Sequence, residues 1–571
     1  MNTQSLQDGT RCDVLVIGAG VSGLTTAIVA AKHGLNVVVV EKAPVFGGTA
    51  AYSGGVLWIP GNHVARASGI QDTREAALEY IRHETQANFN PEVIDAFLDK
   101  APEMAEFFER ETEVKFIPTL YPDYHPDQVG AAQQGRSILA KPYDIRALGP
   151  DMKRLRPPLK TITFIGMMFN SSSPDIRHFF NVTKSLGSFL YVTRRLSKHL
   201  KELVLYRRGI NVTSGNALMA RLAKTALDLD IPIHTECPVS GLVENGGRIT
   251  GALVRSEQGE LRIHADKAVV LAAGGFPHDE ARIREVYPHV ARGGEHLSPT
   301  PVENTGDGVR LAEGLGAELT RGSANASAWI PVSRVPFGGG KTGVFPHLID
   351  RYKPGVIGVT RDGRRFTNEA NSYHDVGQAM IQACAESKET AMWLICDHPT
   401  IRKYGLGYAK PAPMPLGPML KRGYLHKGAT LRDLARATGI DADGLEETVR
   451  AFNASARHGE DPTFHRGSTA FNRYLGDAEH RPNPCVAPIE TGPFYALKLV
   501  MGDLGTFEGL RTALTGEVLG PAGQAIPGLY AVGNDRASIF GGNYIAAGIT
   551  LGPNMTFSYI TAKHIAQATQ P

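Results

Sequence analysis

Three glycines near the start of the chain have the types and spacing that bind a nucleotide pyrophosphate. Gly18, Gly20 and Gly23 form a Gly-x-Gly-x-x-Gly pattern, and a carboxylate, Glu41, follows them. In such a loop the first glycine permits a tight turn, the second lets the backbone approach the pyrophosphate, and the third lets a helix pack closely on a strand. The carboxylate accepts hydrogen bonds from ribose hydroxyls and disfavours a 2′-phosphate. The pattern predicts a dinucleotide site.

The elements that must position this loop can be read on both sides of it. Residues 13–17 are a short β-branched run of the kind buried in a parallel sheet, and residues 36–40 are a second apolar run. Between them lies an alanine-rich stretch that we expect to be helical to about His33, with Gly34 closing it. The N-terminus of that helix stabilises phosphate charge. We therefore predict a parallel strand–helix–strand unit.

A second glycine-rich loop directly after Glu41 distinguishes FAD from NAD as the bound dinucleotide. It resembles flavoprotein folds, in which this loop runs along the pyrophosphate and the flavin, whereas NAD dehydrogenases usually continue with another helix. Two distant segments, residues 267–275 and 528–534, fit the same domain as a strand and as a strand followed by a loop. The predicted cofactor is FAD. Its predicted contacts are Gly18, Gly20, Gly23, Glu41, Lys42, Gly47, Gly48, Thr49, Ser53, Gly54, Gly55, Val239, Ala273, Gly274, Gly533, Asn534, Ile549 and Leu551.

Size and composition limit the class of protein. A chain of 571 residues exceeds the size at which one hydrophobic core keeps growing, so we expect two domains. Five cysteines without a CxxC pair argue against a metal site or a disulfide framework and fit a reducing compartment, the cytoplasm. The polar first twelve residues and the lack of a run of about 18 apolar residues predict neither a secretory signal nor a membrane span.

The charge is uneven although its formal sum is only +3. Residues 141–210 hold fourteen Lys and Arg against four Asp and Glu, and they include the apolar clusters 162–169 and 189–192. Such a mixture predicts an insertion that contacts an anionic lipid surface peripherally. The alternative is a solvated insertion whose arginine stems cover apolar surface. Nucleic-acid binding is not expected, because no reader motif accompanies the charge.

Three longer segments go beyond FAD binding in general. They are GGTAAYSGGVLWIPGN (47–62), GRRFTNEANSYHDV (363–376) and GNDRASIFGGNYIAAGITLGPNMTF (533–557). Together they resemble the flavoprotein family of fumarate reductases and, within it, the 3-ketosteroid Δ1-dehydrogenases. The resemblance implies an α/β fold with a Rossmann-like FAD-binding domain, discontinuous in sequence, and an inserted α+β substrate-binding domain. The implied boundaries are 1–291 and 482–571 for the FAD-binding domain and 292–481 for the inserted domain.

The resemblance also implies roles for four residues. The family's Tyr-x-x-x-Gly pair, which bonds the substrate's ketone oxygen through a hydroxyl and a backbone N–H, corresponds to Tyr544 and Gly548. The tyrosine after the Arg-x-x-Asn-Glu signature, which removes a proton, corresponds to Tyr373, and the tyrosine that assists it corresponds to Tyr124. Tyr121, three residues before Tyr124, is an alternative for that assisting role.

These roles also make chemical sense from the residue types. Removing a proton beside a ketone requires two donors on one oxygen to stabilise the enolate. A phenol has an ordinary pKa of about 10 and is a poor base near neutral pH. Tyr373 therefore needs a hydrogen bond that favours its charged form, and Tyr124 is the candidate donor. His125 is an alternative base.

Two departures from the motifs of related flavoproteins limit the class of substrate and the way in which the cofactor is attached. Where fumarate reductases have His-Gly-x-Asn-Arg, this chain has Phe540 to Tyr544, so a dicarboxylate substrate is not expected. No histidine lies between Glu41 and Asn62, so FAD is predicted to be non-covalent.

Three functions remain open. The first is 1,2-desaturation of a 3-ketosteroid. The second is a related ketone desaturase, a Δ4-(5α)-ketosteroid dehydrogenase or an oxocyclohexane desaturase. The third is a membrane-docked flavin module that relays electrons. The sequence does not name the electron acceptor, for which a quinone, oxygen and a partner protein are candidates.

Overall fold

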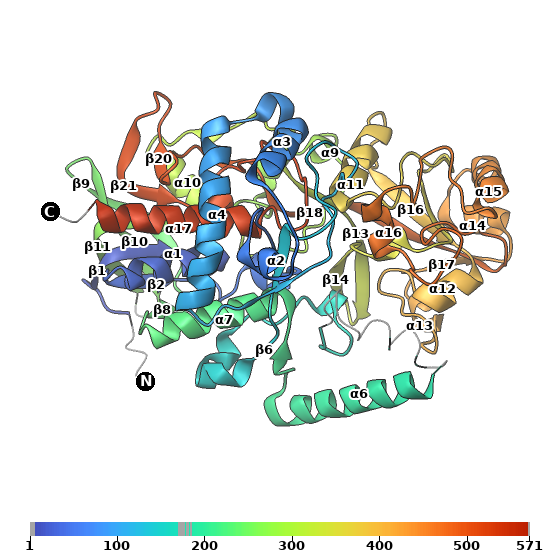
Figure 1. The fold of residues 1–571 in the computed structure, drawn as a ribbon, viewed down its shortest axis with the longest axis horizontal. Coiled ribbons are helices and arrows are strands. Elements are labelled where there is room, and N and C mark those ends of the chain that lie inside the picture. The colour runs from blue at the N-terminus through green and yellow to red at the C-terminus, as the bar shows by residue number, and fades with distance from the viewer. Residues whose placement is uncertain (1–5, 169–177, 179–181, 183–184, 258, 569–571) are drawn as a thin grey trace.

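The computed structural model describes residues 6–168, 178, 182, 185–257 and 259–568. The chain has a mixed α/β fold built around two large sheets (Figure 1). Among the described residues, all five cysteines are buried and unpaired. No described helix is both long enough and apolar enough to pass through a bilayer.

The first sheet has the strand order β20-β21-β11-β1-β2-β8, and β9 and β10 extend it from β11 as an antiparallel ribbon. The central pairs are parallel, with Val14 opposite Val37 and Val269 opposite Leu529. All four residues of β2 are valines and all are buried, as expected for a strand covered on both faces. The strands are β1 (Arg11–Ile17), β2 (Val37–Val40), β8 (Ile233–His234), β9 (Val239–Asn245), β10 (Arg248–Ser256), β11 (Gly259–Leu271), β20 (Glu517–Leu519) and β21 (Ala525–Ala531).

Helix α1 (Val21–Lys32) joins β1 to β2, as the sequence predicts. Gly20 is its N-cap, and Gly34 follows its C-cap with a φ of 83°, a conformation that glycine adopts without strain. α17 (Leu551–Gln567) and α7 (Ser214–Asp228) pack against α1, so segments far apart in the sequence cover one face of the sheet (Figure 1).

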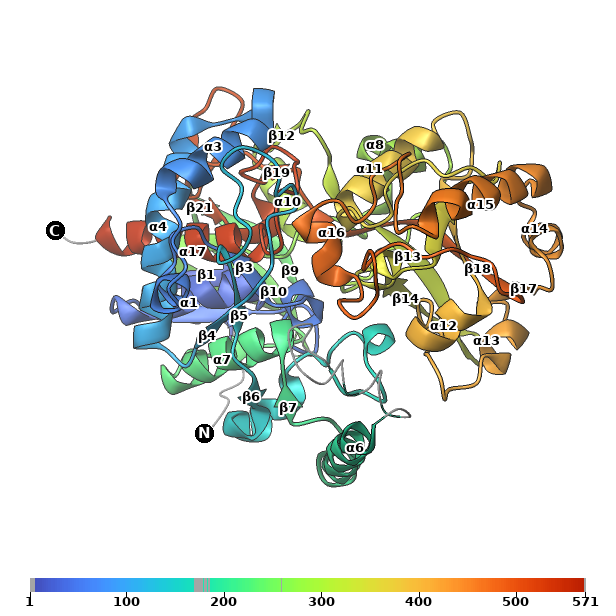
Figure 2. The same ribbon diagram turned by 45° about the vertical axis from the view of Figure 1, so that its right-hand side comes forward.

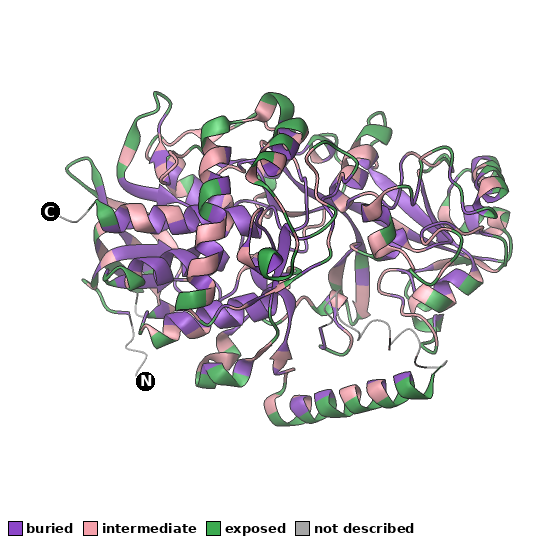
Figure 3. Cartoon of the chain, viewed as in Figure 1, coloured by how far each residue is buried: buried purple, intermediate pink, exposed green. Residues whose placement is uncertain are grey.

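The second sheet has the order β14-β13-β18-β16-β15, with β17 beside β18. Its pairs are antiparallel, and most of its side chains are buried (Figure 3). The strands are β13 (Ser327–Gly338), β14 (Lys341–Pro346), β15 (Val356–Val359), β16 (Ala391–Cys396), β17 (His426–Gly428) and β18 (Phe494–Thr506). The helices beside it are α11 (Tyr373–Ala383), α12 (His398–Tyr404), α13 (Gly417–Lys421), α14 (Leu431–Thr438), α15 (Ala442–Ala456) and α16 (Ala470–Leu475).

The points at which the chain passes from one sheet to the other come later in the sequence than the predicted domain boundaries at 292 and 482. α10 (Asp307–Glu313) lies beyond 292 but contacts β9 of the first sheet. β18 lies beyond 482, yet it pairs with β13 and β16 through a continuous register, including Val332 opposite Val500. Backbone pairing assigns a strand to its sheet, and no local signal in residues 494–506 distinguishes the two sheets. The chain re-enters the first sheet only at β20.

The remaining elements cover the first sheet and connect the two. β3 (Val56–Trp58), β4 (Phe116–Pro118) and β5 (Ser137–Ala140) form a small sheet, and β12 (Leu319–Thr320) pairs with β19 (Gly509–Leu510). The helices not yet named are α2 (His63–Ala67), α3 (Arg74–Thr85), α4 (Pro91–Glu111), α8 (Glu280–Val286) and α9 (Pro288–Ala291).

The basic stretch 141–210 begins and ends at the same place in the fold. β6 (Tyr143–Asp144) pairs with β7 (Asn211–Val212), so the two ends of the stretch are side by side. Between them, α6 (Leu186–Tyr206) lies apart from both sheets in both views (Figures 1 and 2).

Candidate active site

One continuous cavity of about 770 Å³ is lined by residues of both sheets and their loops. Segments that follow β1, β2 and β11 line one part, and segments around β14, α11 and α16 line the other. This volume lies in the range of small-molecule sites, which favour the meeting of two structural units.

The first glycine loop is shaped by close backbone contacts. A Cβ on Gly18, whose φ is 112°, would lie 2.2 Å from the Ala272 carbonyl oxygen, and a Cβ on Gly23 would lie 1.8 Å from the Gly18 oxygen. A Cβ on Gly20 would meet nothing within 4 Å, and Gly20 lines the cavity. Gly18 and Gly23 thus allow close packing, and Gly20 leaves the backbone open to a ligand.

Glu41 lies at the cavity with its carboxylate fixed by the backbone. Its two oxygens accept hydrogen bonds from the amides of Ala43 and Ala19, both at 2.8 Å. Burial raises the pKa of Glu41, while these two hydrogen bonds act in the opposite direction. Each oxygen keeps a second acceptor position for a ribose hydroxyl.

Most of the predicted FAD contacts lie around this one cavity. Gly23, Gly47 and Ile549 do not line it: Gly23 packs behind Gly18, the Gly47 amide donates to the Ala19 oxygen, and Ile549 borders a small neighbouring cavity. The predicted contacts that do line it are Gly18, Gly20, Glu41, Lys42, Gly48, Thr49, Ser53, Gly54, Gly55, Val239, Ala273, Gly274, Gly533, Asn534 and Leu551. A glycine-lined cradle with an acid at one end fits a dinucleotide such as FAD.

Several cavity residues were not found from the sequence. Arg156 lies over the Tyr52 ring at 5.7 Å and pairs with Glu303 at 3.2 Å, and the Asn304 side chain donates to the Thr49 hydroxyl at 2.9 Å. These residues come from segments far from either glycine loop, so no spacing rule identifies them. Further cavity residues that the sequence did not single out include Ser22, within the first glycine loop, and Ser214, Asp307, Thr550 and Asn554.

The three predicted catalytic tyrosines form one cluster at the other part of the cavity. The Tyr373 ring lies 5.9 Å from Tyr124 and 5.2 Å from Tyr544, edge-on to both, and Tyr124 stacks on Tyr544 at 5.7 Å. The Tyr373 hydroxyl is close enough to the other two hydroxyls for each to affect its pKa. Tyr121 instead packs against Tyr474 at 4.6 Å. Of the two tyrosines in this loop, Tyr124 is therefore the one in ring contact with Tyr373.

The sequence predicts a hydrogen bond from Tyr124 that favours the charged form of Tyr373, but in the resting structure the interaction with Tyr124 has the opposite effect on the Tyr373 pKa. Burial raises the pKa of Tyr373 well above its ordinary value, and the neighbouring tyrosines and the hydrogen bonds to them raise it further. The main reason is that burial removes the phenolate from water, and donation of the single Tyr373 O–H to a neighbouring hydroxyl also stabilises the neutral form. The resting group is a phenol.

Tyr544 and Gly548 present two donors to the cavity. Burial raises the pKa of Tyr544, which keeps its hydroxyl protonated. The Gly548 amide makes no hydrogen bond with any described residue, although the Gly548 oxygen accepts one from Trp58. Gly548 has a φ of 97°, and a Cβ there would lie 2.6 Å from the Trp58 amide nitrogen. Only glycine fits this turn.

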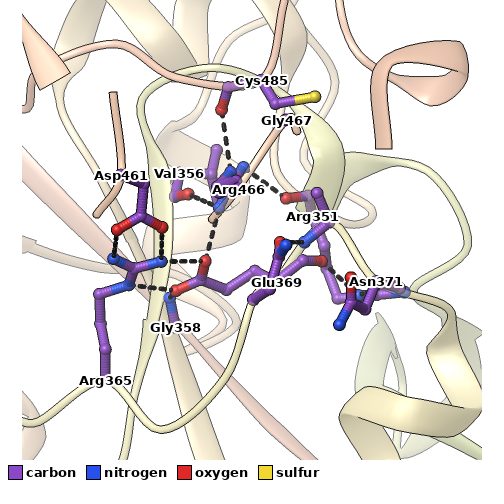
Figure 4. A network of polar contacts seen from close by, with 12 residues as sticks. Arg351, Val356, Gly358, Arg365, Glu369, Asn371, Asp461, Arg466, Gly467 and Cys485 are labelled. Atoms are coloured by element: carbon purple, nitrogen blue, oxygen red, sulfur yellow. Dashed lines mark hydrogen bonds and ion pairs between the residues drawn. The ribbon is translucent and has the colours of Figure 1, made fainter. Parts of the chain in front are cut away.

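Buried ion pairs hold the segment that ends at Tyr373 (Figure 4). Glu369 pairs with Arg365 and Arg466, both at 2.8 Å, and Arg365 also pairs with Asp461 at 2.8 Å. Burial would raise the pKa of Glu369, but the two guanidinium groups lower it to about 2. α11 then begins at Tyr373, because the Ser372 hydroxyl caps the helix by accepting from the Asp375 amide. The Arg-x-x-Asn-Glu signature therefore acts as a structural support.

The loop with Tyr124 is fixed in a similar way. Asp123 is buried between the Trp58 indole N–H at 2.8 Å and Arg136 at 2.7 Å. The next residue, His125, bridges Glu84 and Asp375. Burial alone would lower the pKa of His125, but the hydrogen bonds to Asp375 and Glu84 raise it to about 11. An imidazolium has no free lone pair, so His125 is not a base at neutral pH.

Comparison with known proteins places this site among FAD proteins. The chain is 43% identical over 558 residues to 4-oxocyclohex-2-ene-1-carboxylate 5-dehydrogenase of Sinomonas cyclohexanicum, covering 97% of this chain and 94% of the relative. It is 36% identical to 3-oxosteroid 1-dehydrogenase of Mycolicibacterium smegmatis, covering 98% of both chains.

A solved structure matches the whole chain. It is the crystal structure of 3-ketosteroid delta1-dehydrogenase from Sterolibacterium denitrificans in complex with 1,4-androstadiene-3,17-dione. The TM-score is 0.89 at 32% identity, covering 98% of this chain and 100% of the other. The family model described as FAD binding domain matches residues 13–551. The chain therefore belongs to the FAD binding domain family, and its cofactor is FAD.

Proposed function

We propose that this protein catalyses the FAD-dependent 1,2-desaturation of a 3-ketosteroid. The observation that carries the proposal is the meeting of the Tyr544 hydroxyl, the unpaired Gly548 amide and the Tyr373 hydroxyl at one cavity. Dehydrogenation of a ring ketone is also the activity named for the relatives described above.

The donors and the base have separate tasks in this reaction. Tyr544 and Gly548 bond the ketone oxygen and stabilise the enolate charge that develops when a proton leaves carbon 2. Tyr373 accepts that proton. When bound, FAD supplies the acceptor for the hydride from carbon 1.

The neutral Tyr373 hydroxyl must lose its own proton before Tyr373 can act as the base. The Tyr373 hydroxyl interacts with the hydroxyls of Tyr124 and Tyr544, and of these two only Tyr124 has no task at the ketone oxygen. Tyr124 is itself a neutral phenol and cannot hold an added proton, so the proton of Tyr373 passes to solvent before the reaction. We assign to Tyr124 a hydrogen bond donated to the Tyr373 phenolate that remains, which is the base. Tyr124 thus assists Tyr373 as a donor to its phenolate, the minor form whose fraction rises with pH.

Anaerobic bleaching of the flavin by a panel of ketones tests the proposal. A 3-oxo-4-ene steroid is expected to bleach the flavin and to yield the 1,4-diene. Bleaching by only a 5α-saturated steroid, with a 4-ene product, would assign the Δ4-(5α) reaction. If no ketone bleached the flavin, the chain would be an electron-relay module.

A second candidate, desaturation of an oxocyclohexane carboxylate, is favoured by two lysines. Lys353 and Lys410 both line the cavity, and burial lowers the pKa of each. Neither pairs with a carboxylate among the described residues: Lys353 donates to the carbonyl oxygens of Leu475 and Gly476, and Lys410 lies over two aromatic rings. These cations suit a substrate carboxylate. Bleaching by 4-oxocyclohexanecarboxylate and not by the steroid would establish this function.

A further inference from the structure

Helix α6 presents an apolar stripe to solvent. Leu186, Leu190 and Val204 are 75%, 59% and 81% exposed, and they repeat at helical spacing on one face. Phe189, Leu200 and Leu205 widen this face. Figure 3 shows the side of α6 that faces away from the body as mostly exposed. Elsewhere in the described chain, exposed large apolar side chains are scattered, whereas on α6 they share one surface.

Basic side chains flank this stripe. Arg194, Lys198 and Lys201 are exposed and follow the same helix at spacings of four and three residues. The one acid within α6, Glu202, is buried and accepts hydrogen bonds from the Ile210 amide at 3.1 Å and the Asn211 side chain at 2.7 Å. The outer surface of α6 is therefore apolar and cationic, with no exposed carboxylate of its own.

The inner face of α6 reaches the active-site cavity. Val192 and Leu196 line the same cavity as Tyr373 and Tyr544. Ile162, Phe164 and Met168, from the segment that leads toward α6, also line it. The His199 ring is hydrogen-bonded to the Ile165 carbonyl oxygen at 2.9 Å, which holds the helix against that segment. α6 thus covers an apolar end of the cavity.

We propose that α6 lies on the surface of an anionic lipid bilayer and that apolar substrate enters the cavity beneath it. An apolar stripe beside cations inserts at the headgroup level while the cations bind anionic headgroups. A lipid surface offers both an apolar interior and anionic headgroups along the whole length of the helix. The route for substrate rests on the proposed ketosteroid activity, whereas the docking itself does not.

Vesicle co-sedimentation of the holoenzyme tests the docking. We expect binding to vesicles of equal parts phosphatidylcholine and phosphatidylserine, and much weaker binding to phosphatidylcholine alone. The combined Arg194→Gln, Lys198→Gln and Lys201→Gln variant should lose at least about tenfold in affinity for the anionic vesicles. A matched triple variant, Arg255→Gln, Lys388→Gln and Lys427→Gln, removes the same charge from exposed sites elsewhere and should bind nearly as well as the parent.

A second variant tests the apolar stripe. Leu190→Ser, Leu200→Ser and Val204→Ser together should abolish sedimentation, while Val129→Ser with Val302→Ser, also exposed apolar sites, should not. Flavin content and thermal melting check that every variant is folded. Equal binding by the α6 variants and their controls would overturn the proposal. The proposal would also be overturned if the parent protein formed an oligomer that the serine variant does not form and if the parent did not sediment with vesicles.

The entry route is tested by how the substrate is presented. With a 3-ketosteroid dissolved in the vesicles, the serine variant should turn over at least about tenfold more slowly than the parent. With the same steroid carried by cyclodextrin, the two should be equal. Equal rates from vesicles would overturn the route. No turnover from either carrier would count against the proposed ketosteroid activity, and sedimentation would then decide the docking separately.

Discussion

At the residue scale, burial decides the chemistry of the tyrosine cluster. The same desolvation that keeps Tyr544 protonated, and therefore a donor, also keeps Tyr373 protonated, which hinders it as a base. The minor ionised form resolves this conflict: once Tyr373 has lost its proton to solvent, its phenolate can accept a hydrogen bond from the neighbouring Tyr124 hydroxyl. The function of each tyrosine thus depends on the other two.

Replacing Tyr373 by Phe removes the proposed base without changing the ring. We expect flavin reduction by substrate to slow by about 100-fold or more, with ketone binding largely retained. Anaerobic stopped-flow reduction and the spectral shift of the oxidised flavin measure the two effects. Tyr121→Phe is the matched control, because Tyr121 packs on Tyr474. Near-normal reduction in the Tyr373 variant would remove this residue from the role of base.

The pH dependence of flavin reduction reports the same group. Because the pKa of Tyr373 is raised above 10, its phenolate fraction increases with pH throughout the accessible range. The rate of reduction should therefore rise with pH and reach no plateau below pH 10. This slope should be absent from the residual rate of the Tyr373→Phe variant. A plateau near neutral pH would indicate a base with a lower pKa.

At the scale of elements, short turns and buried ion pairs position the site. α11 begins at Tyr373 behind the Arg365–Glu369–Arg466 network, and the turn at Gly548 lies against Trp58. Neither segment has a regular repeat of its own. Their positions depend on contacts with distant parts of the chain.

Replacing Glu369 by Gln breaks two buried ion pairs. The change leaves buried Arg466 without its carboxylate partner and Arg365 with Asp461 alone, and should cost about 3–5 kcal/mol in the free energy of unfolding. Glu446→Gln, at a solvent-exposed pair with Arg432, should cost no more than about 1 kcal/mol. Chemical denaturation measures both. Similar losses in the two variants would mean that the buried network does not stabilise this region.

The turn at Gly548 is expected to tolerate no side chain. Gly548→Ala should displace the turn and reduce both ketone binding and the rate of flavin reduction by at least about tenfold. Gly523→Ala controls for backbone strain, because Gly523 has a similar positive φ but open space around its Cβ position. Unchanged activity in the Gly548 variant would place the second donor elsewhere.

At the scale of the whole molecule, one cavity connects the two sheets. Residues from β1 to α17 contribute to its wall, so a ligand that fills the cavity stabilises the folded chain as a unit. The insertion that contains α6 adds an outer apolar and basic surface at one end of the cavity. The fold thus combines a cofactor site, a substrate site and an outer face.

Removing FAD should therefore lower the stability of the regions around both sheets. Added FAD at 1,000 times its dissociation constant should stabilise the folded state by about 4 kcal/mol. Thermal melting of the apoprotein against FAD concentration measures this, with NAD as a control that should have little effect. A melting temperature that does not depend on the FAD concentration would contradict FAD binding in this cavity.

Local patterns in the sequence predicted much of the cofactor site and little of the substrate site. Gly18, Gly20 and Glu41 were identified because turn geometry and phosphate binding impose fixed spacings on nearby residues. Arg156, Lys353 and Lys410 were not, because residues that meet across a cavity between two sheets obey no spacing rule. The later changes of sheet have the same cause, since β13 and β16, which pair with β18 on its two sides, are more than 90 residues distant from it in the chain.

The sequence by itself determined the strand–helix–strand unit, the dinucleotide and the FAD assignment, because these depend on residues within a few turns of one another. Only the tertiary structure decided that Tyr373 rests as a phenol, that Tyr124 and not Tyr121 lies in ring contact with it, and that α6 exposes its apolar face. Burial and electrostatic environment depend on every element packed around a group. A pKa or an exposed face is therefore a property of the folded molecule.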